Sequence, residues 1–305
     1  MKILFIGNSF HQKTKSHQFF LDILTDLGNV DVRWDDSFNP NPKTSAKLDD
    51  ANTFDLVVVW QVYIPAIMLA RCGIKNLVYV PMADSMWGDE PNAKYLLPHK
   101  ILCFCEQQYN DIQPQGFNNI FYSRYFRKPS ATPITDFSSI RPFMWQRRDY
   151  PNWKTALQLL GKTKYKSLTI KLHPDPTAGI ERPNAIDCED HRLTLANDWL
   201  SSYDFNAMLE RHNLFFAPRT MEGIGMSFLD AMAMGIPVIA YDAPTMNEYI
   251  ISGYSGHLYK GLPQAIEGLT TSTLKKWSQN TLSIVEAGYE QWMNDIERLK
   301  TWITS

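Results

Sequence analysis

The sequence predicts an α/β protein with two domains, each built on a parallel β-sheet. Short apolar runs bounded by polar residues or glycine alternate along the chain with segments whose apolar residues recur at helical spacing. The chain has 305 residues. This is more than one hydrophobic core usually organises, so two domains of about 130–150 residues are expected. Residues 129–141 hold Pro129 and Pro133 among serines and threonines, which indicates a linker between domains over 1–128 and 142–287.

The first domain is expected to begin with a strand and to alternate strands with helices. The run Asp-Leu-Val-Val-Val-Trp at 55–60 is almost wholly apolar, as strands buried on both faces of a parallel sheet are. Segment 64–72 has helical spacing and stops at Gly73, because glycine readily adopts the conformation that ends a helix. The other expected elements are strands over 2–7, 30–34, 76–80, 100–105 and 119–122 and a helix over 17–27.

The second domain continues the alternation and ends in a long helical segment. Strands are expected at 143–145 and 167–172, with helices at 153–160 and 203–211. The segment 273–303 is predicted to be helical with a break at Gly288, because glycine is a poor helix former. Its last part carries apolar residues at intervals of three and four, namely Tyr289, Trp292, Met293, Ile296, Leu299 and Trp302.

Residues 214–241 are the most informative stretch of the chain. Two short apolar runs, 214–217 and 237–241, have the pattern of buried parallel strands. Between them, Gly223 and Gly225 allow close approach of a ligand to the backbone, and a helix is expected to open at about Met226 and to stop at Gly235. The N–H groups of that helix start would lie at the carboxyl end of the first strand, where open α/β sheets bind ligands.

This stretch resembles the donor-sugar site of GT-B glycosyltransferases, in particular the large retaining family with an acid, seven residues and a second acid before a Gly-x-Pro-Val-Ile strand. Here the acids are Glu222 and Asp230. The resemblance implies two Rossmann-like domains facing across a cleft. It also implies that Glu222 contacts the transferred sugar, that Asp230 binds the ribose, and that the diphosphate is taken by Gly223, Ile224, Gly225, Met226 and Ser227. The family has glutamate at the second position, so Asp230 reaches one methylene less. An ordinary strand–helix–strand unit with surface acids is the alternative.

The same resemblance gives expectations for other parts of the second domain. An arginine at the head of this domain and a nearby lysine grip the diphosphate in the family, which implies that role for Arg147 or Arg148 with Lys154, although a solvated surface pair stays open. The last helix of GT-B proteins commonly packs on the first domain, which implies such a crossover for 288–305. A plain amphipathic core helix has the same pattern.

The string Thr-Ile-Lys-Leu-His-Pro is a strand that ends at Lys171 and His173. Strand alternation puts both side chains on one face. A similar Lys-Leu-His-Pro occurs in other GT-B transferases beside the nucleotide phosphates, so the resemblance implies donor binding by both residues. A lone histidine is also often structural, and that reading stays open for His173.

Weaker signals in the first domain point to the acceptor side. Asn8 and His11 follow the first strand in a loop with one glycine, which is not a dinucleotide fingerprint and argues against a dehydrogenase. Gln61 follows the third strand. Related transferases place a histidine or acid at such strand ends, beside the reacting carbon, and Asp84 is the best local acid for a catalytic role, with an N-cap as its alternative. Trp87 is a candidate sugar-stacking surface.

Composition excludes several other classes of protein. The net charge of −2 provides no field for binding nucleic acid. The four cysteines have neither a CxxC spacing nor a matching histidine pair, which favours free thiols in a reducing compartment over a metal site; they are Cys72, Cys103, Cys105 and Cys188. No apolar run approaches the roughly 18 residues of a membrane span. Met1-Lys2 leads straight into a strand, so no leader peptide is expected.

The sequence therefore predicts a glycosyltransferase that moves a hexose from a nucleoside diphosphate sugar to a saccharide or lipid-linked acceptor, with retention, in surface polysaccharide biosynthesis. No metal or other cofactor is expected. We expect a cytoplasmic protein, with contact to the inner face of the membrane left open, since Lys300 alone gives the aromatic helix a thin basic face. A nucleotide-sugar 2-epimerase of the same fold and a non-catalytic glycan-binding protein are the alternatives.

Overall fold

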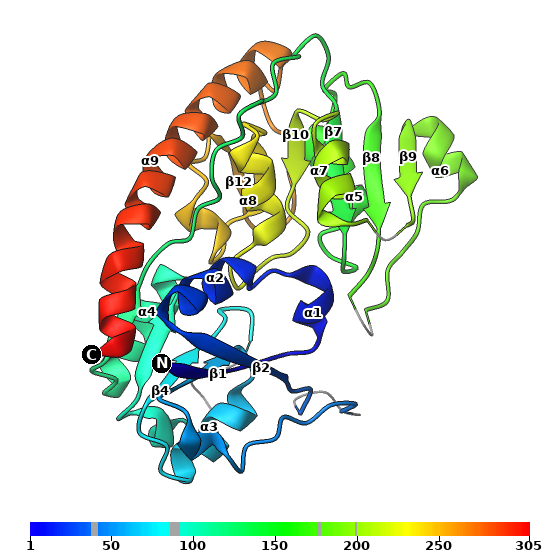
Figure 1. The fold of residues 1–305 in the computed structure, drawn as a ribbon. Coiled ribbons are helices and arrows are strands. Elements are labelled where there is room, and N and C mark those ends of the chain that lie inside the picture. The colour runs from blue at the N-terminus through cyan, green and yellow to red at the C-terminus, as the bar shows by residue number, and fades with distance from the viewer. Residues whose placement is uncertain (38–41, 86–91, 176–177, 199) are drawn as a thin grey trace. The chain divides into compact units, whose positions relative to one another are not determined.

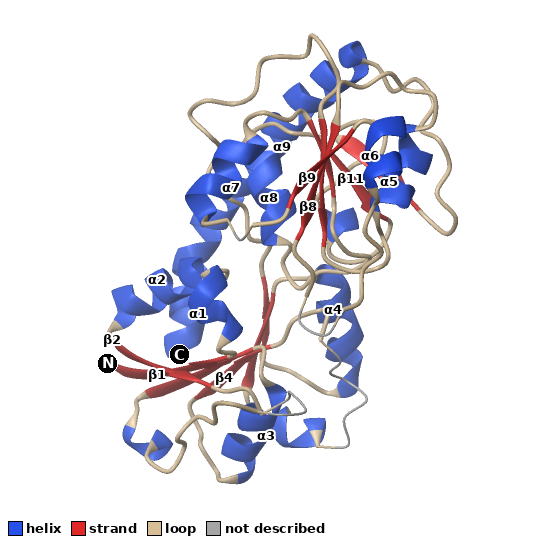
Figure 2. Ribbon diagram, turned by 90° about the vertical axis from the view of Figure 1, so that its right-hand side faces the viewer, coloured by secondary structure: helices blue, strands red, loops and turns tan. Residues whose placement is uncertain are grey.

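The computed structural model describes residues 1–37, 42–85, 92–175, 178–198 and 200–305. They form two compact units: unit 1 comprises Met1–Tyr125 with Gln291–Ser305, and unit 2 comprises Phe126–Glu290. Within these described residues, each unit holds a six-stranded parallel sheet with helices packed on it (Figures 1 and 2). The predicted α/β class with two Rossmann-like sheets is confirmed.

Unit 1 has the strand order β2-β1-β3-β4-β5-β6. The central strand β3 is buried along its whole length because all five of its residues are apolar. Helices α2 and α3 lie on opposite faces of the sheet (Figure 1). The elements are β1 (Lys2–Gly7), α1 (Phe10–Thr14), α2 (Gln18–Leu27), β2 (Asn29–Trp34), β3 (Leu56–Trp60), α3 (Tyr63–Arg71), β4 (Leu77–Val80), β5 (Lys100–Cys103), α4 (Glu106–Ile112) and β6 (Ile120–Tyr122).

Unit 2 has the strand order β12-β11-β10-β7-β8-β9. Helices α5 and α6 lie on one face of its sheet and α7 and α8 on the other (Figure 2). The elements are β7 (Pro142–Gln146), α5 (Trp153–Leu160), β8 (Leu168–Leu172), α6 (Ala185–Asp190), β9 (Leu193–Ala196), α7 (Ser202–Leu209), β10 (Leu214–Phe216), α8 (Met226–Ala233), β11 (Val238–Tyr241) and β12 (Gly256–Tyr259). The edge strands β9 and β12 were not predicted.

The C-terminal helix α9 (Thr271–Thr304) runs without interruption, so the predicted break at Gly288 is wrong. A Cβ atom at Gly288 would lie 2.5 Å from the Phe126 ring. Gly288 therefore has a packing role, because only a residue without a side chain lets the helix approach that ring so closely.

The end of α9 packs within unit 1, as the predicted crossover requires. Trp292 and Leu299 are buried, and the Trp292 ring lies 5.8 Å from the ring of Phe19. The Lys100 Nζ atom donates to the carbonyl of Ile303 at 2.9 Å, and the Lys300 ammonium pairs with Asp26 at 3.0 Å. The aromatic stripe of this helix is thus partly used for packing inside unit 1.

The segment predicted as a linker, residues 129–141, is hydrogen-bonded to the C-terminal end of α8. The amide of Ser130 donates to the carbonyl of Ala233 at 2.8 Å, and the amide of Ile134 donates to the carbonyl of Met234 at 2.9 Å. These backbone bonds fasten the segment to unit 2 as far as β7.

Candidate functional site

The strand order of unit 2 reverses direction at β7. The chain runs outward from β7 through β8 to β9 and then returns to place β10 on the other side of β7. Loops after strands that flank such a reversal run in opposite directions, which makes the carboxyl ends of these strands the usual ligand site of an open α/β sheet. Arg147 follows β7, Asp175 follows β8 and Arg219 follows β10, so neighbouring strand ends bring these residues together.

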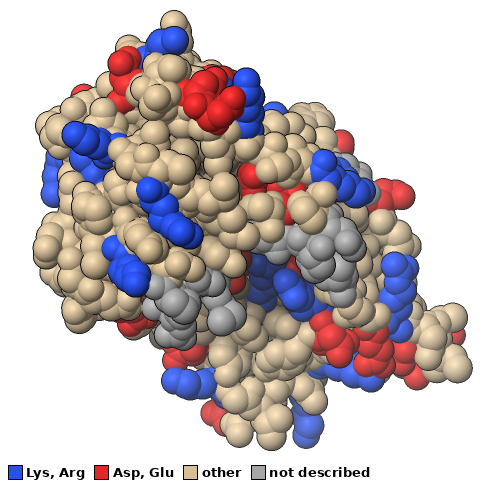
Figure 3. All heavy atoms as spheres, turned by 90° about the horizontal axis from the view of Figure 1, so that it is seen from below, with Lys and Arg blue, Asp and Glu red and all other residues tan. Residues whose placement is uncertain are grey.

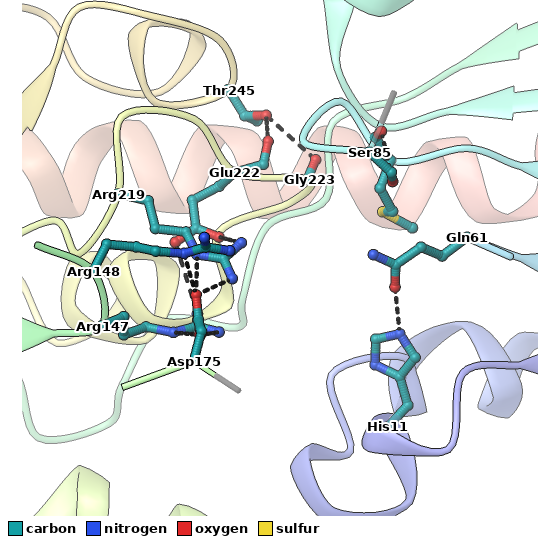
Figure 4. Close-up of polar contacts among 11 residues, drawn as sticks. His11, Gln61, Ser85, Arg147, Arg148, Asp175, Arg219, Glu222, Gly223 and Thr245 are labelled. Carbon is teal, nitrogen blue, oxygen red and sulfur yellow. Dashed lines mark hydrogen bonds and ion pairs between the residues drawn. The ribbon is translucent and has the colours of Figure 1, made fainter. Parts of the chain in front are cut away.

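Three arginines converge on the carboxylate of Asp175, and we call these four residues the arginine cluster (Figure 4). Arg147 donates from Nε to Oδ1 of Asp175 at 2.8 Å, and its Nη2 lies 2.6 Å from the same oxygen. Arg148 donates from Nε to Oδ2 at 2.8 Å. Arg219 donates to Oδ2 from Nε at 3.1 Å and from Nη2 at 2.5 Å.

Burial and charge act in opposite directions on Asp175, whose side chain is only 5% exposed. Burial raises the pKa of its carboxyl, but the positive charges and hydrogen bonds of Arg147 and Arg219 outweigh this effect and hold the pKa below the usual value. Asp175 is therefore ionised. The Arg147 guanidinium also lies over the Trp145 ring, 5.1 Å from its centroid, which restricts the orientation of that side chain further.

Glu222 lies between two arginines of the cluster. Its Oε1 is 4.0 Å from Nη1 of Arg147 and its Oε2 is 3.9 Å from Nη1 of Arg219. The backbone carbonyls of Glu222 and Gly223 accept from the buried hydroxyl of Thr245, at 2.5 and 3.3 Å (Figure 4). The loop that carries this acid is thereby held from the β11 side, and the carboxylate is 8% exposed.

Helix α8 begins directly after this loop, as predicted. Its N-cap is Gly225 with φ 81°, a left-handed conformation that favours glycine. A Cβ atom there would lie 1.8 Å from the Phe228 ring. Gly223, Ile224 and Ser227 are buried beside it. With glycine at the N-cap, no side chain caps the first turn of α8, which is the local requirement for an anion to bind there.

The second acid of the motif already has a basic partner within unit 2. Oδ1 of Asp230 lies 2.7 Å from Nε of Arg127. Burial raises the pKa of the Asp230 carboxyl, and the Arg127 charge opposes that shift. The Asp230 side chain is therefore oriented by Arg127.

The other basic residues predicted for the donor site have different surroundings. Lys154 is about half exposed and pairs with Glu181 at 2.5 Å. Lys171 is 1% exposed, and its ammonium lies 3.7 Å from the centroid of the Trp145 ring. His173 accepts at its backbone carbonyl from Nε1 of Trp145 at 3.0 Å. Lys171 and His173 thus contact the tryptophan on which Arg147 stacks, one from inside β8 and one from the loop after it.

Unit 1 reverses its strand order between β1 and β3, and two predicted residues meet at that point. The His11 Nε2 lies 2.8 Å from Oε1 of Gln61 (Figure 4). The His11 Nδ1 lies 2.8 Å from Oγ of Ser16. An amide oxygen only accepts, so Nε2 carries the proton and Nδ1 accepts from Ser16. Gln61 has φ 68°, which is unusual for a residue with a side chain.

Burial favours the neutral form of His11 at this site. Burial lowers its pKa, while the hydrogen bond with Gln61 and the charge of Asp84 oppose the shift. Asp84 is exposed in the loop after β4. Asn8 is buried and uses its amide nitrogen on Asp36 at 2.9 Å and its amide oxygen on the Phe10 amide at 3.0 Å, so it shapes the loop that carries His11. Trp87 lies outside the described residues.

Two residues of the arginine cluster, Asp175 and Arg219, were missed by sequence reasoning. Both lie in loops that also carry predicted site residues, namely His173 and Glu222. Arg219 stands three residues before Glu222, and Asp175 stands two residues after His173. Their positions in the sequence could have indicated them, because each follows a predicted strand and so lies at the carboxyl edge of the sheet, where ligands bind.

Part of the chain that forms this site is similar to a known protein family. Residues 198–291 match the family model described as glycosyl transferases group 1. The second half of unit 2 is therefore similar to group 1 glycosyltransferases. The matched span includes Arg219, Glu222 and all of α8, so the glycosyltransferase segment coincides with one side of the arginine cluster. No curated protein matches the chain in sequence.

Solved structures of this glycosyltransferase fold superpose on nearly the whole chain. Sucrose-phosphate synthase from Thermosynechococcus elongatus is 12% identical with a TM-score of 0.70, covering 99% of this chain and 98% of that one. HepE of Anabaena, in complex with UDP and glucose, is 13% identical with a TM-score of 0.63, covering 98% and 100%. The lipopolysaccharide outer core galactosyltransferase WaaB is 13% identical with a TM-score of 0.63, covering 99% of each chain. The chain therefore has the GT-B fold, and its match to the group 1 model supports a transferase.

The surface of this protein carries charges of both signs. Figure 3 shows lysine and arginine side chains interspersed with aspartate and glutamate on one face. Within the described residues, no group of three histidine, cysteine, aspartate or glutamate side chains is arranged to hold a metal ion. In the same residues, no helix is both long and apolar enough to span a bilayer. The four cysteines all lie within the described residues and form no disulfide bond.

Proposed function

We propose that this enzyme transfers a hexose from a nucleoside diphosphate sugar to a hydroxyl of a saccharide or lipid-linked glycan. The observation that carries the proposal is the arginine cluster with Glu222 beside it, at the switch point of unit 2 and next to the start of α8. Guanidinium groups and a helix start both favour phosphate oxygens. HepE, which shares the fold, is solved with UDP and glucose.

In this proposal the arginine cluster binds the diphosphate. Arg147, Arg148 and Arg219 carry three positive charges, and Asp175 and Glu222 carry two negative ones, which leaves one net positive charge before the donor arrives. The leaving group is a nucleoside diphosphate whose negative charge grows as the bond to the sugar breaks. Fixed guanidiniums stabilise that charge without reorganising, a role that this proposal assigns to arginine rather than to a metal ion.

The sugar would lie next to Glu222. A carboxylate at the edge of the diphosphate site can accept hydrogen bonds from sugar hydroxyls and thus fix the ring over the arginines. In the transfer step the bond from the anomeric carbon to the phosphate oxygen breaks and a bond to the acceptor oxygen forms. The acceptor oxygen attacks from the face that the phosphate leaves, so that the configuration is retained, and its proton passes to the leaving phosphate oxygen.

The acceptor would be contacted by the switch-point residues of unit 1. His11 and Gln61 form a hydrogen-bonded pair there, and the exposed Asp84 is close enough to influence the pKa of His11. Hydroxyl groups of a glycan suit such a neutral pair with one nearby carboxylate. WaaB of the same fold acts on a lipopolysaccharide outer core, and we accordingly propose a surface glycan as the acceptor class.

The deciding experiment incubates the enzyme with a panel of nucleoside diphosphate sugars and analyses the products. Release of free sugar from one donor, faster with added glycan acceptors, supports the transferase. Interconversion of two nucleotide sugars would identify the epimerase instead. Thermal stabilisation by no nucleotide, together with no turnover, would indicate a glycan-binding protein and overturn the proposal.

The substitution Glu222→Gln tests the role of the acid on the preferred donor. It keeps the shape of the side chain but removes the charge, and a hydrogen bond to a charged group contributes about 1.5–3 kcal/mol. We expect turnover to fall about 10- to 150-fold, with the melting temperature close to that of the parent. Glu181→Gln, which alters an exposed carboxylate paired with Lys154, is the matched control. Turnover of the Glu222 variant within a factor of about two of the parent would show that this acid has no role.

A further inference from the structure

We propose that Asp175 is a positioning residue for the diphosphate site, holding the three arginines so that their remaining N–H groups meet the donor. The proposal rests on the function proposed above and extends it to a residue that never touches the substrate. Its side chain is 5% exposed and is surrounded by the guanidiniums of the cluster. Its effect on the donor must therefore pass through the arginines.

The guanidiniums of Arg147 and Arg219 use different nitrogen atoms toward Asp175 and toward Glu222. Arg147 and Arg219 each direct Nε and Nη2 to Asp175. Each directs Nη1 toward Glu222, at 4.0 and 3.9 Å, beyond hydrogen-bonding distance. The edge of each guanidinium that carries Nε and Nη2 thus binds the buried carboxylate of Asp175. Its Nη1 lies on the side of Glu222, where the proposed sugar and phosphate would bind. A guanidinium has five N–H donors, so Asp175 engages only some of the donors of each arginine.

The backbone around Asp175 keeps this arrangement fixed to the sheet. The amide of Asp175 donates to the carbonyl of Arg147 at 3.0 Å, which joins the loop after β8 to the end of β7. Arginine side chains have many rotamers, and a binding site loses less entropy when its donors are already ordered. The negative charge of Asp175 also offsets the mutual repulsion of three cations held on two oxygens of one carboxylate.

In the alternative role, the carboxylate of Asp175 would compete with the donor phosphates for the arginines. The two roles predict opposite signs for removal of the charge. If Asp175 positions the arginines, Asp175→Asn weakens binding of a nucleoside diphosphate. If it competes, the same substitution strengthens binding, because more N–H groups and more positive charge become available.

The experiment measures binding of UDP, ADP, GDP and CDP to the full chain by calorimetry and continues with the tightest ligand. The variants are Asp175→Asn and Asp175→Glu, with Asp136→Asn as the control, because Asp136 also pairs with an arginine in unit 2 but on the surface. For Asp175→Asn we expect binding weaker by about tenfold or more, the effect of one charge-assisted hydrogen bond. KM for the donor should rise in parallel, with kcat reduced less.

The glutamate variant keeps the charge and displaces it by one methylene. We expect it to bind the nucleotide with an affinity between those of the parent and the asparagine variant, and the control to bind as the parent does. Folding is checked first by circular dichroism, and if Asp175→Asn does not fold, the glutamate variant decides. Unchanged or tighter binding in a folded Asp175 variant overturns this inference. Failure of the parent to bind any nucleoside diphosphate overturns the proposed function instead, so the two failures are distinguishable.

Discussion

Replacement of Arg219 by methionine is the sharpest test of the arginine cluster, because only the tertiary structure places this residue in the cluster. In the structure Arg219 makes two hydrogen bonds to Asp175 and approaches Glu222 to 3.9 Å. Methionine preserves much of the length and apolar volume of the side chain but has no N–H donors. Asp175 keeps Arg147 and Arg148 as partners, so the substitution does not leave a buried carboxylate without compensation.

The magnitude follows from the hydrogen bonds to phosphate that the methionine variant cannot form. A guanidinium–phosphate hydrogen bond is charge-assisted and contributes about 1.5–3 kcal/mol. Removing one such bond raises the dissociation constant for the nucleoside diphosphate about 10- to 150-fold. Arg219→Lys keeps the charge without the planar fork, so we expect a smaller effect for it. Arg148→Met should also weaken binding less than Arg219→Met, since its side chain is 52% exposed and makes one bond to Asp175.

Isothermal titration calorimetry with the tightest-binding nucleoside diphosphate is the assay, and Lys164→Met is the matched control. Lys164 is exposed in the loop before β8, at the amino edge of the sheet and therefore on the edge opposite to the arginine cluster, so its variant should bind the nucleotide within about twofold of the parent. If Arg219→Met also binds within twofold of the parent, or if the Lys164 variant loses as much affinity, the donor phosphates do not bind at the arginine cluster.

Two further predictions concern stability. Gly288→Ala should destabilise unit 2 by up to about 2 kcal/mol in urea unfolding. Overpacking against Phe126 costs about 1–3 kcal/mol, and alanine recovers about 1 kcal/mol in a helix interior. A more stable variant would contradict the packing role. Burial lowers the pKa of both His17 and His212 to about 4, below the value of about 6.5 in the unfolded chain. Their stabilising contribution is therefore complete above pH 6.5 and is lost as the pH falls toward 4. The urea midpoint should fall over that range and less so in a His17→Phe variant, whereas an unchanged midpoint between pH 7 and pH 5 would show that neither histidine acts in this way.

Local sequence patterns were enough to predict most of the elements that carry the site. The uninterrupted apolar run of β3 and the glycine before α8 report on burial and backbone conformation within a few residues, and both were found from the sequence. The strands β9 and β12 were missed because each has only four residues, and these residues show neither a continuous apolar run nor a regular alternation of buried and exposed positions. Gly288 was misread because its local propensity gave no sign of the Phe126 ring that lies against it.

The sequence by itself determined the fold class, the loop with Glu222 and the helix start that follows it, because each depends on residues close together in the chain. Only the tertiary structure decided which side chains share that site. Arg147, Asp175 and Arg219 are brought together by the order of β8, β7 and β10 in the sheet. That order is set by how whole helices and strands pack, and no short segment of sequence contains it.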